Sequence, residues 1–401
     1  YLYKAGILKR RVYPHAGLQR LLDAGTLGET VGPETIEAML DAGCLPARPG
    51  PDDVRRLQEL GIFDRDLRFE DGRLVLPDGE EVPAELDRRE VREALYRCGL
   101  GERLLGGTVA HGGFFLGPRR FLQTLRDLTD DERREINMTS VSWTNQLYGD
   151  QELKIAQRRK ARFLNSCMMM TLLGAAVSDG LEDGRVLSGV GGQYDFVAMA
   201  HALPEARSIL LMRSVRTSHG EPVSNFRWSY GHVTIPRHLR DVVVTEYGIA
   251  DLRGKSDAEV VGALLNVADS RFQDELAGEA KRAGKLPRDH RIPDRHRENV
   301  PERLERAVAP FREDGHFPEW PQGSDFTPEE QVLAKALKAL KAKVERERLP
   351  LPGRAHAAKI LRPPEAARPY LERMELDRPR GIGERLLRAQ VLWGLALVGE
   401  I

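Results

Sequence analysis

The sequence has few cysteines and no apolar run of membrane-spanning length. Its longest apolar stretch, Cys167–Val177, has about eleven residues, whereas a membrane-spanning helix needs about 20. We therefore expect this stretch to be buried core. The three cysteines, Cys44, Cys98 and Cys167, lie far apart and form no CxxC pair. This spacing argues against a disulfide scaffold and a zinc ribbon, and it predicts reduced thiols in a cytoplasmic protein.

The sequence also has no excess of positive or negative charge. Lys and Arg together number 61, and Asp and Glu also number 61. A balanced chain has no overall field that attracts nucleic acid or an anionic membrane, so we expect neither as a partner. The 10 histidines form no HExxH motif and no close cluster with cysteine, which disfavours a metal centre. The sequence also lacks the GxSxG motif of the nucleophile elbow, which disfavours a serine hydrolase.

The chain starts without methionine and without a signal peptide. It opens with YLYKAGILKR, which we interpret as the last turns of a helix closed by Gly6. We therefore expect residues 1–17 to be the end of a helix from a missing N-terminal part, and the chain to be a piece of something longer.

The 401 residues leave room for about two or three domains. Residues 18–105 are rich in short helical patterns and charge, and we interpret them as a mostly helical inserted subdomain. Two LLDAG-like phrases, which end at Gly25 and Gly43, each predict a short helix stopped by glycine. The turn chemistry around Asp78 predicts a small hairpin over 74–82.

Residues 106–275 alternate strand and helix patterns, which predicts an α/β domain with a mainly parallel sheet flanked by helices. Capping boxes at Thr129–Glu132 and Ser256–Glu259 mark two helix starts. The strands that we expect are short, apolar and bounded by Gly or charge: Arg185–Ser188, Ser208–Met212 and Asp241–Thr245. Residues 276–401 form a proline-punctuated tail with two amphipathic helices, at 327–344 and 383–398.

The strongest local feature is SGVGGQYDF at 188–196, which we place between a strand and an apolar helix. Its glycines leave backbone N–H groups uncovered, and the helix start adds partial positive charge. Such a loop can hold a phosphate or stabilise an oxyanion. It is neither a dinucleotide fingerprint nor a P-loop. A tight strand-to-helix turn with no ligand explains the same residues.

Two further features carry polar side chains beside apolar runs. Glu246 follows the expected strand at 241–245, where open α/β sheets place their ligand crevice. Glu246, Asp251 and Arg253 could equally form a structural ion network. Asn165 stands before the apolar run and could orient a carboxylate or a thioester carbonyl, or be a hydrogen-bonded core residue.

Together these segments resemble the acetyl-CoA hydrolase/transferase family, a CoA-transferase-like group, in its C-terminal domain portion. The matching phrases are FLNS at 163–166, SGVGGQYDF at 188–196 and VVTEYGIADLRG at 243–254, in the family's order. Fainter matches lie at 112–117 and at Asn145. One phrase would be weak, but three in order are specific.

The resemblance implies covalent catalysis, in which a glutamate attacks a short-chain acyl-CoA such as acetyl-CoA. A carboxylate or water then resolves a glutamyl-CoA intermediate. Coenzyme A is thus a substrate, no cofactor is bound tightly, and we expect a homo-oligomer. The resemblance also implies residue roles. Gly191 and Gly192 would line the oxyanion site, Asn165 would orient the transferred carboxylate, and Glu246 would support the site wall. The expected substrate and CoA contacts are Gly189, Gln193 and Asp195.

Three departures from the family pattern matter. Met168–Met170 stand where many relatives carry an acidic pair, and residues 18–105 have no counterpart in compact relatives. The nucleophilic glutamate should lie upstream of Tyr1, so we expect the isolated chain to be inactive. The alternative is a non-catalytic CoA-binding or assembly module. An unrelated nucleotide-binding protein is disfavoured by the failed glycine fingerprints.

Overall fold

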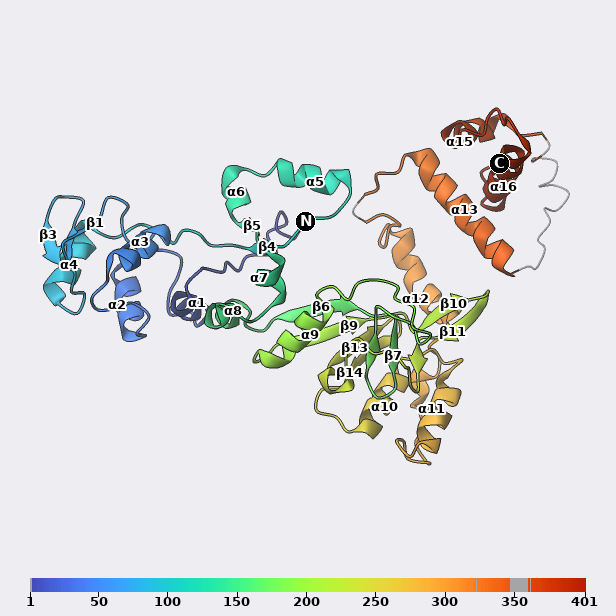
Figure 1. Ribbon diagram of the computed structural model, residues 1–401, viewed down its shortest axis with the longest axis horizontal. Coiled ribbons are helices and arrows are strands. Elements are labelled where there is room, and N and C mark those ends of the chain that lie inside the picture. Colours follow the sequence, from blue (N-terminus) through green and yellow to red (C-terminus); the bar gives the residue numbers. More distant parts are fainter. Residues whose placement is uncertain (1, 322, 347–359, 361) are drawn as a thin grey trace.

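The computed structural model describes residues 2–321, 323–346, 360 and 362–401. Figure 1 shows three regions along the chain: N-terminal helices and a small sheet in blue, a central α/β region in green and yellow, and C-terminal helices in orange and red. The described helices are not long and apolar enough for any of them to cross a membrane.

The N-terminal region combines short helices with a three-stranded antiparallel sheet of order β1-β2-β3. Its elements are α1 (Ala16–Asp23), α2 (Pro33–Asp41), α3 (Pro51–Glu59), β1 (Arg68–Glu70), β2 (Arg73–Val75), β3 (Glu81–Pro83) and α4 (Arg89–Cys98). Gly25 (φ +74°) and Gly43 (φ +64°) follow α1 and α2 in the left-handed conformation, as their phrases predict. The hairpin predicted over 74–82 is confirmed by the pairing of β2 with β3. Residues of this region alone form one buried cluster, which includes Leu18, Ile36 and Leu95.

The helix end predicted at the start of the chain stays a prediction, and residues 2–6 carry hydrogen bonds of the kind that close a helix. Residues 2–6 form a hydrogen-bonded turn, in which the N–H of Gly6 donates to the carbonyl of Tyr3. Gly6 does take the left-handed conformation (φ +66°). The N–H of Ile7 also donates to the carbonyl of Leu2, so Gly6 closes this turn with the two bonds that commonly end a helix.

A connecting region of short elements leads to the central sheet. Its elements are β4 (Ala110–Gly112), α5 (Arg119–Arg126), α6 (Asp130–Arg134), β5 (Ile136–Met138), α7 (Val141–Asn145) and α8 (Gln151–Gln157). The capping box at the start of α6 is confirmed: Thr129 Oγ1 accepts from the N–H of Glu132 at 3.2 Å, and Glu132 Oε2 accepts from the N–H of Thr129 at 2.9 Å. Strands β4 and β5 pair in parallel.

The central sheet has the order β14-β13-β9-β6. Its strands are β6 (Arg162–Ser166), β9 (Arg207–Leu211), β13 (Val242–Thr245) and β14 (Gly248–Asp251). Strands β6, β9 and β13 are parallel, and β14 joins the edge as an antiparallel strand. The helices α9 (Gln193–Ala202), α10 (Asp257–Leu265) and α11 (Gln273–Arg282) flank it. The prediction of a mainly parallel α/β sheet with flanking helices is confirmed.

The apolar run at 167–177 lies in the core of this region. It supplies β7 (Met169–Thr171) and β8 (Ala176–Val177), which form a second small sheet with β12 (Phe226–Arg227). Met170, Leu172 and Val177 are each 1% exposed or less. The prediction of buried core is confirmed. Strands β10 (Val215–Ser218) and β11 (Glu221–Ser224) form a separate hairpin beside this sheet.

Two of the three predicted strands are confirmed, as β9 and β13, and Arg185–Ser188 is wrong. That segment is exposed loop, with Val186 76% and Leu187 53% exposed. The N–H of Leu181 donates to the carbonyl of Arg185 and closes a turn over Gly184 (φ +86°). A short apolar run forms a strand only where a neighbouring strand pairs with it, and here a single bridge from Val186 to Gly180 is formed.

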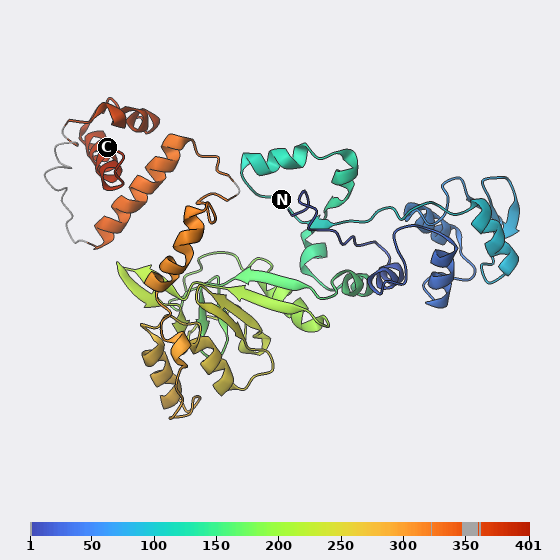
Figure 2. The same cartoon turned by 180° about the vertical axis from the view of Figure 1, so that it is seen from behind.

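The C-terminal part of the chain is helical. Its elements are η2 (Asp294–His296), α12 (Pro301–Glu313), α13 (Pro328–Arg346), η3 (Glu365–Ala367), α15 (Arg368–Arg373) and α16 (Ile382–Leu397), whereas η1 (Arg237–Leu239) belongs to the central region, just before β13. The two predicted amphipathic helices correspond to α13 and α16, which pack together through residues such as Leu333 and Leu392. Figure 2 shows this pair from behind. Helix α12 precedes them, so the tail contains more helix than the sequence predicted.

Candidate active site

The three parallel strands end along one edge of the sheet, at Ser166, Leu211 and Thr245. Open α/β sheets bind ligands outside this carboxyl edge. Helix α9 begins there, because Gln193 Nε2 donates to the carbonyl oxygen of Ser166 at 2.8 Å. The glycine loop at 189–192 immediately precedes α9 and therefore lies at the carboxyl edge.

Two glycines of this loop are required for different reasons. Gly191 has φ +62°, a backbone conformation that strains other residues. Gly192 is the N-cap of α9 with an ordinary φ of −90°, but a β-carbon there would overlap the side-chain amide of Asn145 and lie 3.2 Å from Phe196 Cε2. Within the described part of the chain, the N–H groups of Gly191 and Gly192 donate to no acceptor. They are therefore free to meet an incoming oxygen.

A buried lysine and a half-buried arginine hold the segment that carries Asn145. Arg158 donates to the carbonyl oxygens of Trp143 at 2.5 Å and Gln146 at 3.2 Å. Lys154 donates to the carbonyl of Gln146 at 3.0 Å and lies 4.9 Å from the Trp143 ring centroid. Burial lowers the pKa of both cations, and for Lys154 the charge of Arg158 lowers it further. Neither cation pairs with a carboxylate of the described residues. Their positive charges are stabilised by the backbone carbonyl oxygens to which they donate.

Asn165 lies on the face of β6 that packs against α9. Side chains alternate along a strand, and Phe163, two residues earlier, stacks on Phe196 of α9 with ring centroids 5.9 Å apart. Asn165 Nδ2 is buried and has no hydrogen-bond partner among the described residues, and the same is true of Gln193 Oε1. An unpaired buried donor and an unpaired buried acceptor thus flank Ser166, next to the glycine loop. Buried polar groups normally have partners, so both are available to a ligand.

Gly189 and Asp195, the other predicted substrate contacts, have fewer structural features that indicate a ligand. Gly189 is exposed, and a β-carbon there would meet open space. Asp195 is half-buried in the first turn of α9, where a carboxylate stabilises the positive end of the helix dipole. That structural role accounts for Asp195, and its contact with substrate stays a prediction.

Glu246 lies at the same carboxyl edge, immediately after β13 and two strands away from Asn165. It is exposed, and its Oε2 accepts from the N–H of Ser214 at 2.8 Å. It lines a cleft of about 520 Å³ together with Arg213, Arg216 and Arg271. Glu246 is thus available to a ligand that approaches the edge of the sheet.

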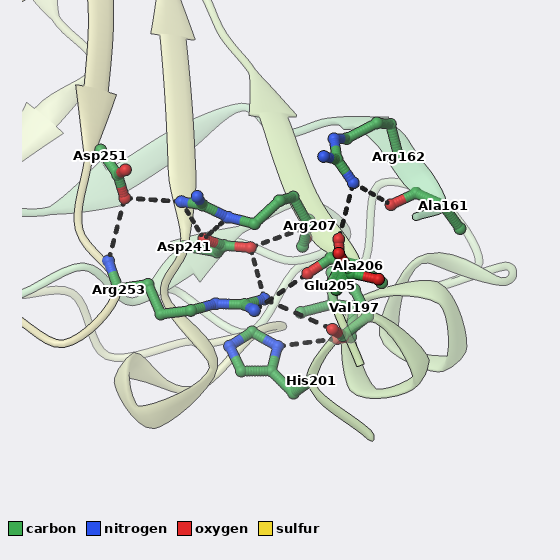
Figure 3. Close-up of polar contacts among 12 residues, drawn as sticks. Ala161, Arg162, Val197, His201, Glu205, Ala206, Arg207, Asp241, Asp251 and Arg253 are labelled. Carbon is green, nitrogen blue, oxygen red and sulfur yellow. Dashed lines mark hydrogen bonds and ion pairs between the residues drawn. The ribbon is translucent and has the colours of Figure 1, made fainter. Parts of the chain in front are cut away.

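Asp251 and Arg253 belong to a structural ion network at the opposite edge, shown in Figure 3. Its centre is Asp241, whose side chain is 0% exposed. Asp241 pairs with Arg207 at 2.7 Å and with Arg253 at 2.6 Å, and Arg207 also reaches Asp251 at 2.6 Å. Of the two readings left open by the sequence, the network therefore holds for Asp251 and Arg253, and Glu246 lies outside it. Arg207 was not among the residues predicted from the sequence, although Asp241, its partner, stands directly before the VVVT strand.

Cys167 is placed for packing. It is 8% exposed, and burial raises the pKa of its thiol to about 12. A thiol with such a pKa is a poor nucleophile at neutral pH. Met169 and Met170 are core residues beside it. Over the described ranges, the His, Cys, Asp and Glu side chains form no group of three that could hold a metal ion.

The central part of the chain, which carries these site residues, is similar to a known family. Residues 117–280 match the acetyl-CoA hydrolase/transferase C-terminal domain. This part of the chain belongs to the acetyl-CoA hydrolase/transferase family. Of the site residues, Asn145, Asn165, the loop at 189–192, Gln193 and Glu246 all lie within this acetyl-CoA hydrolase/transferase domain, whereas α1 to α4 lie outside it.

The relatives of the hydrolase/transferase domain include both transferases and hydrolases. A 4-hydroxybutyrate coenzyme A transferase of Clostridium kluyveri is 32% identical over 139 residues, which are 34% of this chain and 32% of that protein. An acetyl-CoA hydrolase of Candida albicans is 34% identical over 27% of this chain and 21% of its own length. The crystal structure of RipA from Yersinia pestis is 32% identical over 31% of this chain and 27% of that chain, with a TM-score of 0.27. The chain thus spans a third or less of the length of each.

Proposed function

We propose that this chain forms the C-terminal part of an enzyme that transfers CoA between carboxylates or hydrolyses a short-chain acyl-CoA such as acetyl-CoA. The observation that carries the proposal is the pair of free N–H groups, of Gly191 and Gly192, at the start of α9. The unpaired amide donor of Asn165 supports the proposal, because it precedes Ser166, whose carbonyl accepts from Gln193 at the start of α9. Membership of a family whose relatives are named as transferases and hydrolases supports the same chemistry.

The reaction that we propose proceeds through two covalent intermediates. A glutamate carboxylate attacks the thioester carbonyl, and collapse of the tetrahedral intermediate expels CoA thiolate and leaves a mixed anhydride. The thiolate then attacks the glutamyl carbonyl, which releases the acyl group as a free carboxylate and forms glutamyl-CoA. An acceptor carboxylate reverses these steps to give a new acyl-CoA, or water hydrolyses the glutamyl thioester to free CoA. We place the nucleophilic glutamate upstream of Tyr1, as the family resemblance implies.

The residues of this chain would stabilise and position the reacting groups. The N–H groups of Gly191 and Gly192, at the positive end of the α9 dipole, would donate to the oxyanion of each tetrahedral intermediate. The Nδ2 of Asn165 would orient the carboxylate that leaves or enters. Glu246, exposed at the same edge, would form the far wall of the site.

Mass spectrometry tests this proposal directly. The full-length protein incubated with acetyl-CoA should carry a glutamyl-CoA adduct, and the 401 residues alone should show no turnover above background. Asn165→Leu in the full-length protein should slow formation of the adduct, whereas Leu164→Asn, on the exposed opposite face of β6, should not. If the full-length protein binds acetyl-CoA but forms no adduct and no product, the alternative of a CoA-binding module replaces the enzyme.

A further inference from the structure

A cation-rich hollow lies at the amino edge of the sheet, at the other end of the strands from the candidate active site. It has a volume of about 400 Å³. Its lining includes His201, Arg237, His238, Arg240, Arg253 and Lys255. Helix α9 has the candidate oxyanion loop at its start and His201 near its end. Because 10 helical residues span about 15 Å, the hollow is a separate site and no extension of the first.

The charges in the lining do not balance. Asp257 is the one carboxylate among the lining residues, and it already pairs with Arg237 at 3.4 Å and with Arg240 at 3.3 Å. Lys285 reaches the same carboxylate at 2.9 Å. Lys285 first, and Arg240 after it, hold the pKa of Asp257 below its ordinary value. One carboxylate thus serves three cations, which leaves an excess of positive charge in the hollow.

Two of the arginines form a rigid wall. Arg240 donates to the carbonyl of Leu173 at 2.9 Å and to the carbonyl of Lys255 at 2.8 Å. Arg253 donates to the carbonyl of Ala206 at 2.9 Å and pairs with the buried Asp241 (Figure 3). These contacts fix both guanidinium groups, so their charges cannot move apart to relieve repulsion.

Other polar groups of the hollow have free capacity. Within the described residues, the side chains of Lys255 and His238 form no hydrogen bond and no ion pair. His201 Nδ1 lies 3.0 Å from the carbonyl oxygen of Val197 and must carry the proton of that bond, while its Nε2 is buried without a partner. Over the whole chain acids and bases are equal in number, at 61 each. The surplus here is therefore local.

We propose that this hollow binds a small polyanion of the pyrophosphate or phosphomonoester class. Such a group carries several negative charges and several acceptor oxygens, and cationic side chains bind it through charge-assisted hydrogen bonds. Arg237 and Lys255 are the ligands with donors to spare, and Arg240 and Arg253 supply fixed positive charge behind them. The proposal is independent of the reaction proposed above, since it concerns the opposite edge of the sheet.

Calorimetric titration of the whole chain with inorganic pyrophosphate at fixed ionic strength tests the site. Arg237→Gln and Lys255→Gln should each weaken binding by about tenfold, because each removes a charged donor. Neither residue holds the fold together, as Arg237 is 55% exposed and makes only the long contact to Asp257. Lys338→Gln, an exposed position on α13, removes the same charge and should leave binding unchanged.

Two outcomes would overturn the proposal. One is the absence of saturable pyrophosphate binding by the unaltered chain. The other is an equal loss of affinity in Lys338→Gln and in Lys255→Gln. In that case pyrophosphate would respond to net charge alone and would be an adventitious ion only. Thermal unfolding of each variant without pyrophosphate should match that of the unaltered chain. If a variant unfolds early, Lys255→Arg keeps the charge and should retain binding.

Discussion

The side-chain amide of Asn145 lies against Gly192 so closely that residue 192 has no room for a β-carbon. The two residues are far apart in sequence, and the contact joins the end of α7 to the start of α9. The glycine at the N-cap of α9 is therefore required by a tertiary neighbour, whereas Gly191 is required by its own backbone conformation.

The first prediction concerns this contact. Gly192→Ala should destabilise the chain by about 1–3 kcal/mol, because the new methyl group overpacks against Asn145. The double variant Gly192→Ala with Asn145→Ala should regain most of that loss, since removal of the amide makes room. Urea unfolding of both single variants and the double variant measures the coupling. Equal losses in the single Gly192→Ala variant and the double variant would show that the two residues do not compete for space.

The same variants in the full-length protein test whether the loop has the proposed catalytic role or only a structural one. If the loop N–H groups stabilise an oxyanion, Gly192→Val should lower kcat by roughly 10²–10³ beyond any loss of folded protein. The Gly192→Ala and Asn145→Ala double variant should stay slow even where stability is restored, and Asn145→Ala alone gives the baseline. Normal turnover by the folded fraction would make the loop a structural turn.

The second prediction concerns Arg158, the half-buried cation beside α7. Arg158→Met should expose the amides of 141–148 to faster hydrogen exchange, because the carbonyls of Trp143 and Gln146 lose a charged donor. A hydrogen bond to a charged group contributes about 1.5–3 kcal/mol. Lys160→Met is a matched control, because Lys160 is exposed and its substitution removes the same charge as Arg158→Met. Unchanged exchange in Arg158→Met would mean that the segment is held by other contacts.

The third prediction concerns the ion network at the amino edge. Asp241→Asn should lower the free energy of unfolding by about 3–5 kcal/mol, because Arg207 and Arg253 lose their shared buried carboxylate. Asp251→Asn should cost about 1 kcal/mol or less, because that carboxylate is 53% exposed and well solvated. Chemical denaturation measures the free energy of unfolding of both variants. Each variant removes one charge from the same network, at a buried position in Asp241→Asn and at an exposed position in Asp251→Asn. Similar losses would contradict the burial argument.

The fourth prediction concerns the thiols. Burial raises the pKa of Cys167 to about 12, so its thiolate fraction at pH 8 is lower than that of a free cysteine by a factor on the order of 10³. Iodoacetamide should modify Cys44 and Cys98, both half-exposed, before Cys167. Peptide mass spectrometry reads the order, and in denaturant all three should react alike. Rapid labelling of Cys167 in the folded protein would show that the run at 167–177 opens.

Several elements were predictable because their causes are local. The capping box at Thr129 and the glycine stops at Gly25 and Gly43 depend on residues within one or two turns of the chain. Strands β9 and β13 were visible as apolar runs. By contrast, Arg185–Ser188 has apolar character but no partner strand, and it remains loop.

Strand β6 shows the opposite case. Its sequence RFLNS contains three polar residues and only two adjacent apolar ones, so its pattern did not mark it as a strand. Five register pairs with β9 make it one, because the neighbouring backbone supplies the hydrogen bonds that its own pattern does not announce.

The residue pattern was enough to identify the family of this domain, the glycine loop before a helix, Glu246 at the end of a strand and Asn165 before an apolar run. Which of these residues act together became clear only from the folded chain. It placed Asn145 against Gly192, separated Glu246 from Asp251 and Arg253 by the length of β13, and gathered cations from three segments around Asp257. These choices depend on contacts between residues distant in the chain, and local pattern carries no information on which distant residues meet.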